Sequence, residues 1–180
     1  MSDWEGYALP LGHKLCYQNT FYDKEPKLDI MNPPSYLKSS LDFVITSDVF
    51  EHVPPPVSIA FSNLRKILKP GGVVVFTVPF SKEPKTVEHF PDLYDYQLIK
   101  SDNGYQQLMN VTRDGKRQSF HDLVFHGGVG ATLEMRIFSE RDLLEEFEKA
   151  GFKNVTIHTQ SYFEYGIYWS EDWSVTISAR

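Results

Sequence analysis

The stretch that decides the fold reads Leu41-Asp42-Phe43-Val44-Ile45-Thr46-Ser47-Asp48-Val49-Phe50-Glu51-His52-Val53, and three prolines follow it. Residues 41–46 form a compact apolar run without clean alternation, which predicts a strand covered on both faces. In an open parallel sheet, ligands lie beyond the carboxyl ends of the strands. We therefore expect Ser47, Asp48, Glu51 and His52 to form a polar edge, in a loop stiffened by the prolines.

The segment after the prolines predicts the clearest helix of the chain. Apolar residues recur at helical spacing from Val57 to Leu68, and Lys66 and Lys69 occupy the last turns, where the helix dipole favours cations. Pro70-Gly71-Gly72 should stop this helix. A second buried strand, Val73–Val78, follows at once. Together these elements predict a β-α-β unit with a right-handed crossover, the building block of a parallel α/β sheet.

The C-terminal part repeats the alternation of helix and strand. Ser139 resembles a helix cap, with Asp142 three residues further on, and it begins a predicted helix that Gly151 ends. Strands are predicted at Asn154–Thr159 and Ser174–Ser178.

The N-terminal part is less regular. Residues 1–13 read as a loop with at most one helical turn, and the aromatic, β-favouring stretch Lys14–Tyr22 predicts a strand. Asp23–Pro34 is turn material.

Residues 80–137 form a long segment rich in aromatic side chains and histidines. Arg113-Asp114-Gly115, between β-favouring neighbours, predicts a small hairpin. A segment this long between elements of a compact domain is usually functional. Its aromatics are explained either by an acceptor pocket or by a core.

Composition limits the classes of function. A length of 180 residues suits a single domain, and a net charge of -6 without a run of Lys and Arg argues against nucleic-acid binding. No apolar run is long enough to cross a membrane, and Met1-Ser2-Asp3-Trp4-Glu5 does not resemble a signal peptide. The single cysteine, Cys16, is expected to be a buried thiol and suits a reducing compartment, so we expect a cytoplasmic protein.

Two motifs give the chain a family resemblance. Asp48-Val49-Phe50-Glu51-His52 matches the pattern (Asp/Asn)-x-x-(Glu/Gln)-His, and Leu68-Lys69-Pro70-Gly71-Gly72 matches the close of the following helix. In this order and spacing they resemble the fourth strand, its loop and helix, and the fifth strand of class I S-adenosylmethionine (SAM)-dependent methyltransferases. Segments of a bacterial subgroup recur at His121–Gly128 and Leu133–Ser139. The resemblance implies a Rossmann-like α/β fold, mostly parallel, with an antiparallel last strand.

The family's first strand and its Gly-x-Gly turn are not found. Residues 1–13 contain only Gly6 and Gly12, and no apolar strand precedes either. We therefore predict a partial methyltransferase domain over residues 1–180, truncated at the glycine-rich motif, with the first strand missing or incomplete and an acceptor-site-like insert at about 80–137.

The resemblance also implies site residues. His52 is the candidate base for an acceptor hydroxyl, or it only packs or caps the helix. Glu51 would contact the cofactor or orient His52, or it is a solvated carboxylate at the start of the helix. Asp29 would recognise the adenine amino group of SAM; the alternative is that it is an ordinary turn aspartate. The expected SAM-binding residues are Asp3, Asn19, Thr20, Asp29, Ser47, Asp48 and Val49.

The insert supplies His126, Phe80 and His89 as expected contacts of the acceptor. His121, Asp122 and His126 raise the question of a metal, but no further ligand is suitably spaced, so no metal site is predicted.

Two functions follow. One is SAM-dependent methyl transfer to a small-molecule or glycan-like acceptor. The other is a non-catalytic methyltransferase-like module, or a truncated fragment, that no longer binds SAM. A nicotinamide-dependent dehydrogenase is disfavoured because no Gly-x-Gly-x-x-Gly follows a strand.

Overall fold

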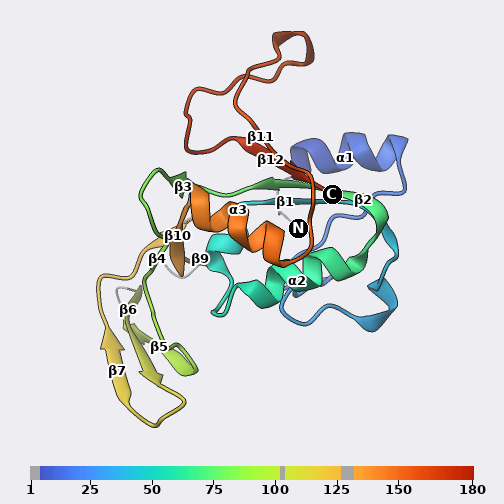
Figure 1. The fold of residues 1–180 in the computed structure, drawn as a ribbon. Helices are drawn as coiled ribbons and strands as arrows, with labels where there is room; N and C mark the ends of the chain where they lie inside the picture. The colour runs from blue at the N-terminus through green and yellow to red at the C-terminus, as the bar shows by residue number, and fades with distance from the viewer. Residues whose placement is uncertain (1–4, 102–103, 127–131) are drawn as a thin grey trace.

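The computed structural model of the chain describes residues 5–101, 104–126 and 132–180. Its main sheet has four strands in the order β1-β2-β12-β11 (Figure 1), namely β1 Leu41–Ser47, β2 Leu68–Thr77, β12 Thr176–Ala179 and β11 Val155–His158. Strands β1 and β2 are parallel, and β12 is antiparallel to both of its neighbours, so β1, β2 and β11 point the same way. The predicted fold, a mostly parallel sheet with an antiparallel last strand, is confirmed.

Helix α2, Ser58–Ile67, connects β1 to β2 and ends earlier than predicted. Leu68 already has an extended backbone and pairs with Leu41, so Pro70-Gly71-Gly72 lies inside β2 rather than at the end of the helix. The register shifts at this point. Gly72 is needed because a Cβ atom there would meet the carbonyl oxygen of Lys69 at 3.0 Å.

The two faces of the sheet are covered unequally. On one face lie α2 and α3, Glu140–Lys149; on the other lies α1, Glu5–Lys14 (Figure 1). Val44, Thr46, Val74 and Phe76 are buried, whereas their strand neighbours are half-buried. The prediction of a strand fully buried on both faces is therefore only half right. Edge-to-face or stacked aromatic rings fill the centre of the main core: Phe50, Phe61, Phe76, Phe138, Phe147 and Phe152.

The N-terminal part differs from its prediction. A helix replaces the loop expected at residues 5–13, although it contains Pro10. The predicted strand Lys14–Tyr22 is wrong: only Phe21 makes an isolated bridge, with Lys27. Cys16 is exposed, not buried. Among the described residues, none pairs with the outer edge of β1.

The start of α3 is capped as its sequence predicts. The Ser139 hydroxyl accepts a hydrogen bond from the Asp142 N–H at 3.1 Å. The Asp142 carboxylate does not turn back to the cap; it accepts from the Thr86 N–H at 2.6 Å, and this bond is the main cause that lowers the pKa of Asp142. The cap therefore also fixes the chain that leads into the insert.

Replacing Ser139 by alanine should lower the free energy of unfolding by about 1 kcal/mol, because the first turn of α3 loses its side-chain acceptor. Urea denaturation measures the change. Ser58→Ala is the matched control, since no side chain caps α2. An equal loss in both variants would contradict the capping role.

The insert adds three small sheets beside the main one (Figure 1). The hairpin predicted around Arg113-Asp114-Gly115 is confirmed, since β6 and β7 are antiparallel on either side of it. A second, smaller core lies here, built from Phe90, Leu93, Leu108, Leu133 and Met135. The strands of the insert are β3 Phe80–Ser81, β4 Val87–Glu88, β5 Asp95–Ser101, β6 Gly104–Val111, β7 Arg117–Phe120, β8 Phe125–His126, β9 Thr132–Leu133 and β10 Arg136–Ser139.

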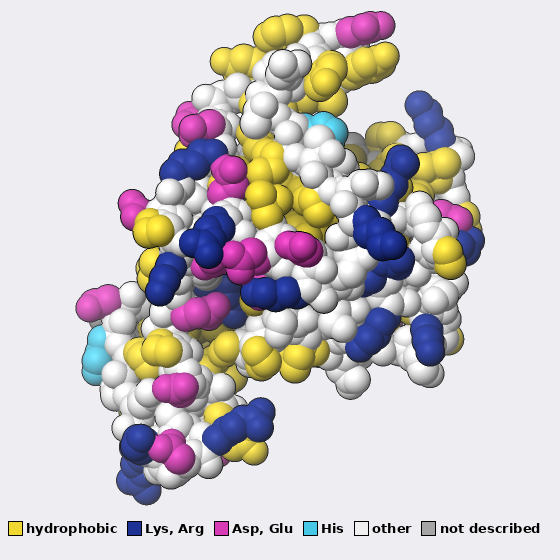
Figure 2. All heavy atoms as spheres, viewed as in Figure 1, with side chains coloured by type: hydrophobic (Ala, Val, Ile, Leu, Met, Phe, Trp, Pro, Cys, Tyr) yellow, Lys and Arg dark blue, Asp and Glu magenta, His cyan; other side chains and the backbone are white. Residues whose placement is uncertain are grey.

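The segment between β11 and β12 projects from the body as an arm (Figure 1) and contains the short helix η3, Phe163–Tyr165. Its tip is yellow in Figure 2 because it exposes the large apolar side chains Tyr162, Phe163, Tyr165 and Tyr168. On the left of the face shown, Lys and Arg side chains are mixed with Asp and Glu, whereas Lys and Arg predominate on the right. Two other short helices are η1, Ser35–Leu37, and η2, Phe50–His52. Within the described residues, no helix is long and apolar enough for a membrane span.

Candidate active site

The predicted polar edge lies where β1 and β2 end. Asp48 follows β1 with a left-handed backbone, φ 50°, and its N–H donates to the Thr77 carbonyl at the end of β2 at 3.0 Å. The Thr77 hydroxyl donates to the Ser47 hydroxyl at 2.9 Å. Aspartate tolerates the left-handed region better than most residues, and strained backbone of this kind is concentrated at functional sites. Ser47 and Asp48 thus form a fixed polar rim at the carboxyl ends of two parallel strands.

A pocket of about 520 Å³ opens beside this rim, in the size range of small-ligand sites. Helix α1 covers it with Tyr7 and Leu11, and Ile45, Thr46 and Thr77 form its floor. Ser47 and Thr77, whose hydroxyls are hydrogen-bonded to each other, line its rim end. The pocket therefore offers an apolar space with polar groups at one end.

Glu51 is the most unusual residue of the site. It lies in η2, is 1% exposed, and neither of its carboxylate oxygens has a hydrogen-bond partner among the described residues. Burial above all, together with the charges of Asp48 and Glu134, raises the pKa of Glu51 to about 8. Glu51 is thus largely protonated at neutral pH.

His52 is held as a neutral imidazole. Its Nδ1 lies 2.9 Å from the Leu133 carbonyl oxygen, an acceptor only, so Nδ1 carries the hydrogen and Nε2 the lone pair. Burial lowers the pKa of His52. The Nε2 atom lies 3.6 Å from Glu51 Oε1. A neutral histidine with a free lone pair is suited to accept a proton.

Two further histidines meet at Glu134. One carboxylate oxygen lies 2.8 Å from His89 Nε2 and the other 2.7 Å from His126 Nε2. The ring of His126 packs edge-on against that of His52, with 4.9 Å between centroids. The structure thus gathers His52, His89 and His126 around two carboxyl groups, three of the residues that were predicted separately.

Arg136 joins the insert to the rim loop. It is fully buried, and its Nη1 donates to the carbonyl oxygens of Phe50 at 2.8 Å and Val53 at 2.7 Å. Its Nε donates to the Glu88 carboxylate at 2.7 Å. The Glu51 carbonyl accepts from the Met135 N–H at 2.7 Å. The strand that carries Arg136 therefore sets the position of Glu51 and His52.

Sequence reasoning missed Glu134 and Arg136. Both lie in the segment Leu133–Ser139, where charged residues alternate with apolar ones. Alternation of this kind predicts a strand whose charged side chains face solvent, so the sequence carried no signal that Arg136 is buried.

The other predicted residues lie elsewhere. Phe80 is 3% exposed in the main core, which leaves almost no ring surface for an acceptor. Asp29 accepts from the Met31 N–H at 2.9 Å, as a turn aspartate does. Val49 packs against the main core. Both polar atoms of the Asn19 side chain are buried without a partner in the described chain, and Thr20 beside it is half-buried. Asp3 lies outside the described residues.

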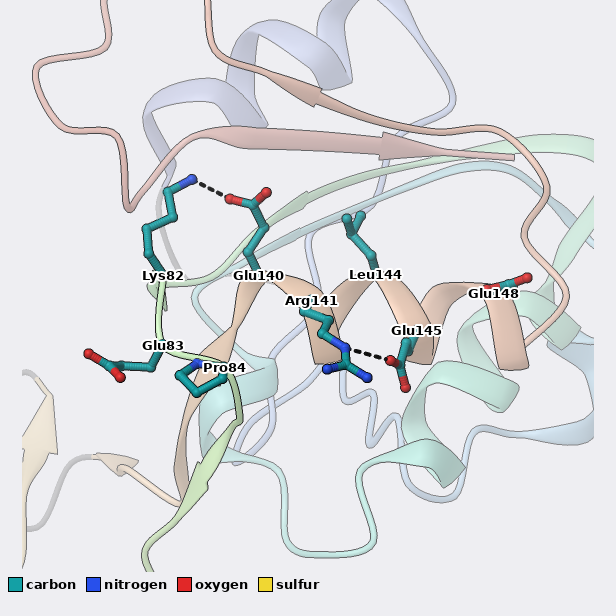
Figure 3. A pocket seen from close by; sticks show the side chains of 8 residues that line it. All are labelled: Lys82, Glu83, Pro84, Glu140, Arg141, Leu144, Glu145 and Glu148. Atoms are coloured by element: carbon teal, nitrogen blue, oxygen red, sulfur yellow. Dashed lines mark hydrogen bonds and ion pairs between the residues drawn. The ribbon is translucent and has the colours of Figure 1, made fainter.

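A larger hollow of about 600 Å³ lies at the start of α3 (Figure 3). Its basic side chains are already paired, Lys82 with Glu140 and Arg141 with Glu145. No predicted site residue lines it, and exposed ion pairs of this kind contribute little. The rim of β1 and β2 is therefore the candidate site.

The sheet order defines the class of fold, a Rossmann-like α/β domain with Ser47 and Asp48 at the carboxyl edge of β1. The chain belongs to a family of methyltransferase domains, whose model matches residues 13–157. A comparison with curated proteins found no match.

Solved structures similar to the chain include two described as SAM-dependent methyltransferases. The one from Mesorhizobium loti is 16% identical, with 86% of this chain and 68% of that chain covered and a TM-score of 0.45. The one from Clostridium acetobutylicum is 16% identical, with 86% and 63% covered and a TM-score of 0.44. A 1,6-didemethyltoxoflavin-N1-methyltransferase from Burkholderia thailandensis is 13% identical, with 84% and 47% covered and a TM-score of 0.42. The chain thus spans 47% to 68% of the length of these proteins.

Proposed function

We propose that this domain transfers a methyl group from SAM to a small-molecule or glycan-like acceptor in a reducing, cytoplasmic environment. The observation that supports this most is the polar rim of a methyltransferase-family sheet, Ser47 and Asp48, beside a pocket of about 520 Å³. SAM supplies an activated methyl group on a sulfonium, so the protein mainly has to align the acceptor.

The described residues fit such a cofactor. The pocket has apolar walls for a ring, and Ser47 and Thr77 at the rim line it with hydroxyl groups. The exposed Asp48 carboxylate at the rim suits a hydroxyl or amino donor. In this proposal Ser47, Asp48 and Val49 contact SAM on one side, and Asn19, Thr20 and Asp29 on the other.

The acceptor is proposed to lie on the insert side of the rim. When it is a hydroxyl, the lone pair on His52 Nε2 takes its proton while the oxygen attacks the methyl carbon. His126 and His89, fixed by Glu134, then line the acceptor side. Protonated Glu51 is a hydrogen-bond donor beside His52.

A second candidate is a methyltransferase-like module that does not bind SAM. One observation favours it: Gly6 and Gly12, the glycines before β1 that could approach a cofactor, lie at a helix and not after a strand. Close backbone approach to a ligand normally uses glycine.

Calorimetric titration with SAM separates the two candidates. We expect one site per chain with micromolar affinity, weakened about tenfold in Asp48→Asn, because a bond to a charged group contributes about 1.5 kcal/mol or more. Asparagine keeps the left-handed backbone at this position. Asp172→Asn, in the exposed arm, is the control and should bind like the parent. No heat from a chain that is folded by circular dichroism would support the second candidate instead.

A further inference from the structure

Glu51, His52 and His126 form a cluster whose possible ligand atoms converge. One carboxylate oxygen and one ring nitrogen from each histidine all lie within 4.8 Å of one another. His52 Nε2 and Glu51 Oε1 are 3.6 Å apart, close to the separation of two ligands on one tetrahedral metal ion. Glu51 and His52 come from η2 and His126 from β8, so two distant segments build the cluster.

The ligand atoms are oriented by outer hydrogen bonds. The Leu133 carbonyl holds His52 Nδ1, which directs the lone pair of Nε2 into the cluster. One oxygen of the Glu134 carboxylate lies 2.7 Å from His126 Nε2, and the other contacts His89 Nε2. Histidines that bind metals almost always have such a carbonyl or carboxylate partner on the other ring nitrogen.

A second observation points to a missing ligand. Glu51 is 1% exposed, and both its carboxylate oxygens lack a hydrogen-bond partner in the described part of the chain. A carboxyl group without a hydrogen-bond partner is costly in such a place whether it is neutral or charged, and a buried carboxylate is normally paired or coordinates a metal. The charge of the nearby Arg136 acts on Glu51, but the Nη1 and Nε of Arg136 donate to other acceptors, and its buried Nη2 makes no hydrogen bond to Glu51.

We propose that Glu51, His52 and His126 bind one divalent transition-metal ion of the zinc type. Two imidazoles and one carboxylate are the protein ligands of many catalytic zinc sites, which keep the fourth position for water or substrate. Mg²⁺ and Ca²⁺ prefer oxygen ligands alone. Along the sequence only His121 and Asp122 stand near His126 as possible ligands, whereas in the structure Glu51 and His52 lie beside it.

This site goes beyond the proposed methyl transfer, which needs no metal. The cation would use the lone pair of His52 Nε2, so a metal-loaded chain cannot also use that atom as a base. A bound ion would instead coordinate an acceptor oxygen directly and act as a Lewis acid.

The test is a calorimetric titration of the chelator-treated full chain with ZnCl₂. We expect one ion per chain with micromolar or tighter affinity, at least tenfold weaker in His126→Ala and in Glu51→Gln. His126 is 37% exposed, so its truncation removes little packing, and circular dichroism checks the fold. Co²⁺ added in place of Zn²⁺ should give the visible absorption of a cobalt ion with nitrogen ligands, lost in His126→Ala.

His121→Ala is the matched control, since His121 is an exposed histidine of the same segment that lies against Ser119. Unsaturable binding, parental affinity in His126→Ala, or an equal loss in His121→Ala would overturn the proposal. SAM titration of the same samples is a separate readout. A chain that binds Zn²⁺ but not SAM keeps the metal site and rejects the proposed function, and the opposite result does the reverse.

Discussion

Replacing Arg136 by methionine should lower the free energy of unfolding by about 3 kcal/mol or more. The fully buried guanidinium donates to the carbonyls of Phe50 and Val53 and to Glu88, and methionine donates to none of them. Two buried carbonyls then lose their donor, which costs about 1 to 3 kcal/mol each, and Glu88 loses its charge partner. Urea denaturation monitored by circular dichroism measures the loss.

Arg141→Met removes the same charge from an exposed site and serves as the control. Its side chain is 72% exposed and pairs with Glu145 one turn away, so its loss should cost less than about 1 kcal/mol. Similar losses in the two variants would mean that Arg136 acts only through its charge. A large loss in Arg136→Met alone would show that the carbonyls of the rim loop depend on this one donor.

Local patterns in the sequence were enough for much of the fold. The unit β1-α2-β2, the cap at Ser139 and the hairpin around Asp114 were predicted because periodicity, capping and turn chemistry act over a few residues. Lys14–Tyr22 failed for the opposite reason. Its aromatic residues fit a strand, but strand propensity depends on a partner, and in the described chain Phe21 finds only an isolated bridge.

Only the part of the site that follows β1 was predictable from the sequence; the part that the insert contributes was not. Ser47, Asp48, Glu51 and His52 follow a strand, so their place at the rim could be inferred from the order of elements. The contacts that Leu133 makes with His52, and Arg136 with Phe50, arise from tertiary packing between segments about 80 residues apart. Nothing in local spacing predicts such contacts, and for the same reason Phe80 was expected in a pocket and lies in the core.

Glu51→Gln should make the chain more stable than its parent as the pH rises from 5 to 8. The pKa of Glu51 is raised to about 8 in the folded chain, from 4.5 in the unfolded one. Below pH 4.5 both states hold the proton, so ionisation makes no difference. Between these values the unfolded chain ionises first, so the parent loses stability progressively, and above pH 8 the loss is complete.

The size of this effect follows from the pKa difference. Each unit corresponds to 1.36 kcal/mol, so the gap between parent and Glu51→Gln should widen by roughly 3 to 5 kcal/mol over this range. Urea denaturation at several pH values, in a chelator so that no metal binds Glu51, measures it. Glu148→Gln, on the exposed side of α3, is the control and should show a gap that stays constant. A constant gap in Glu51→Gln as well would mean that water or a cation reaches the carboxylate, because only an unpaired, dry carboxylate opposes its own ionisation this strongly.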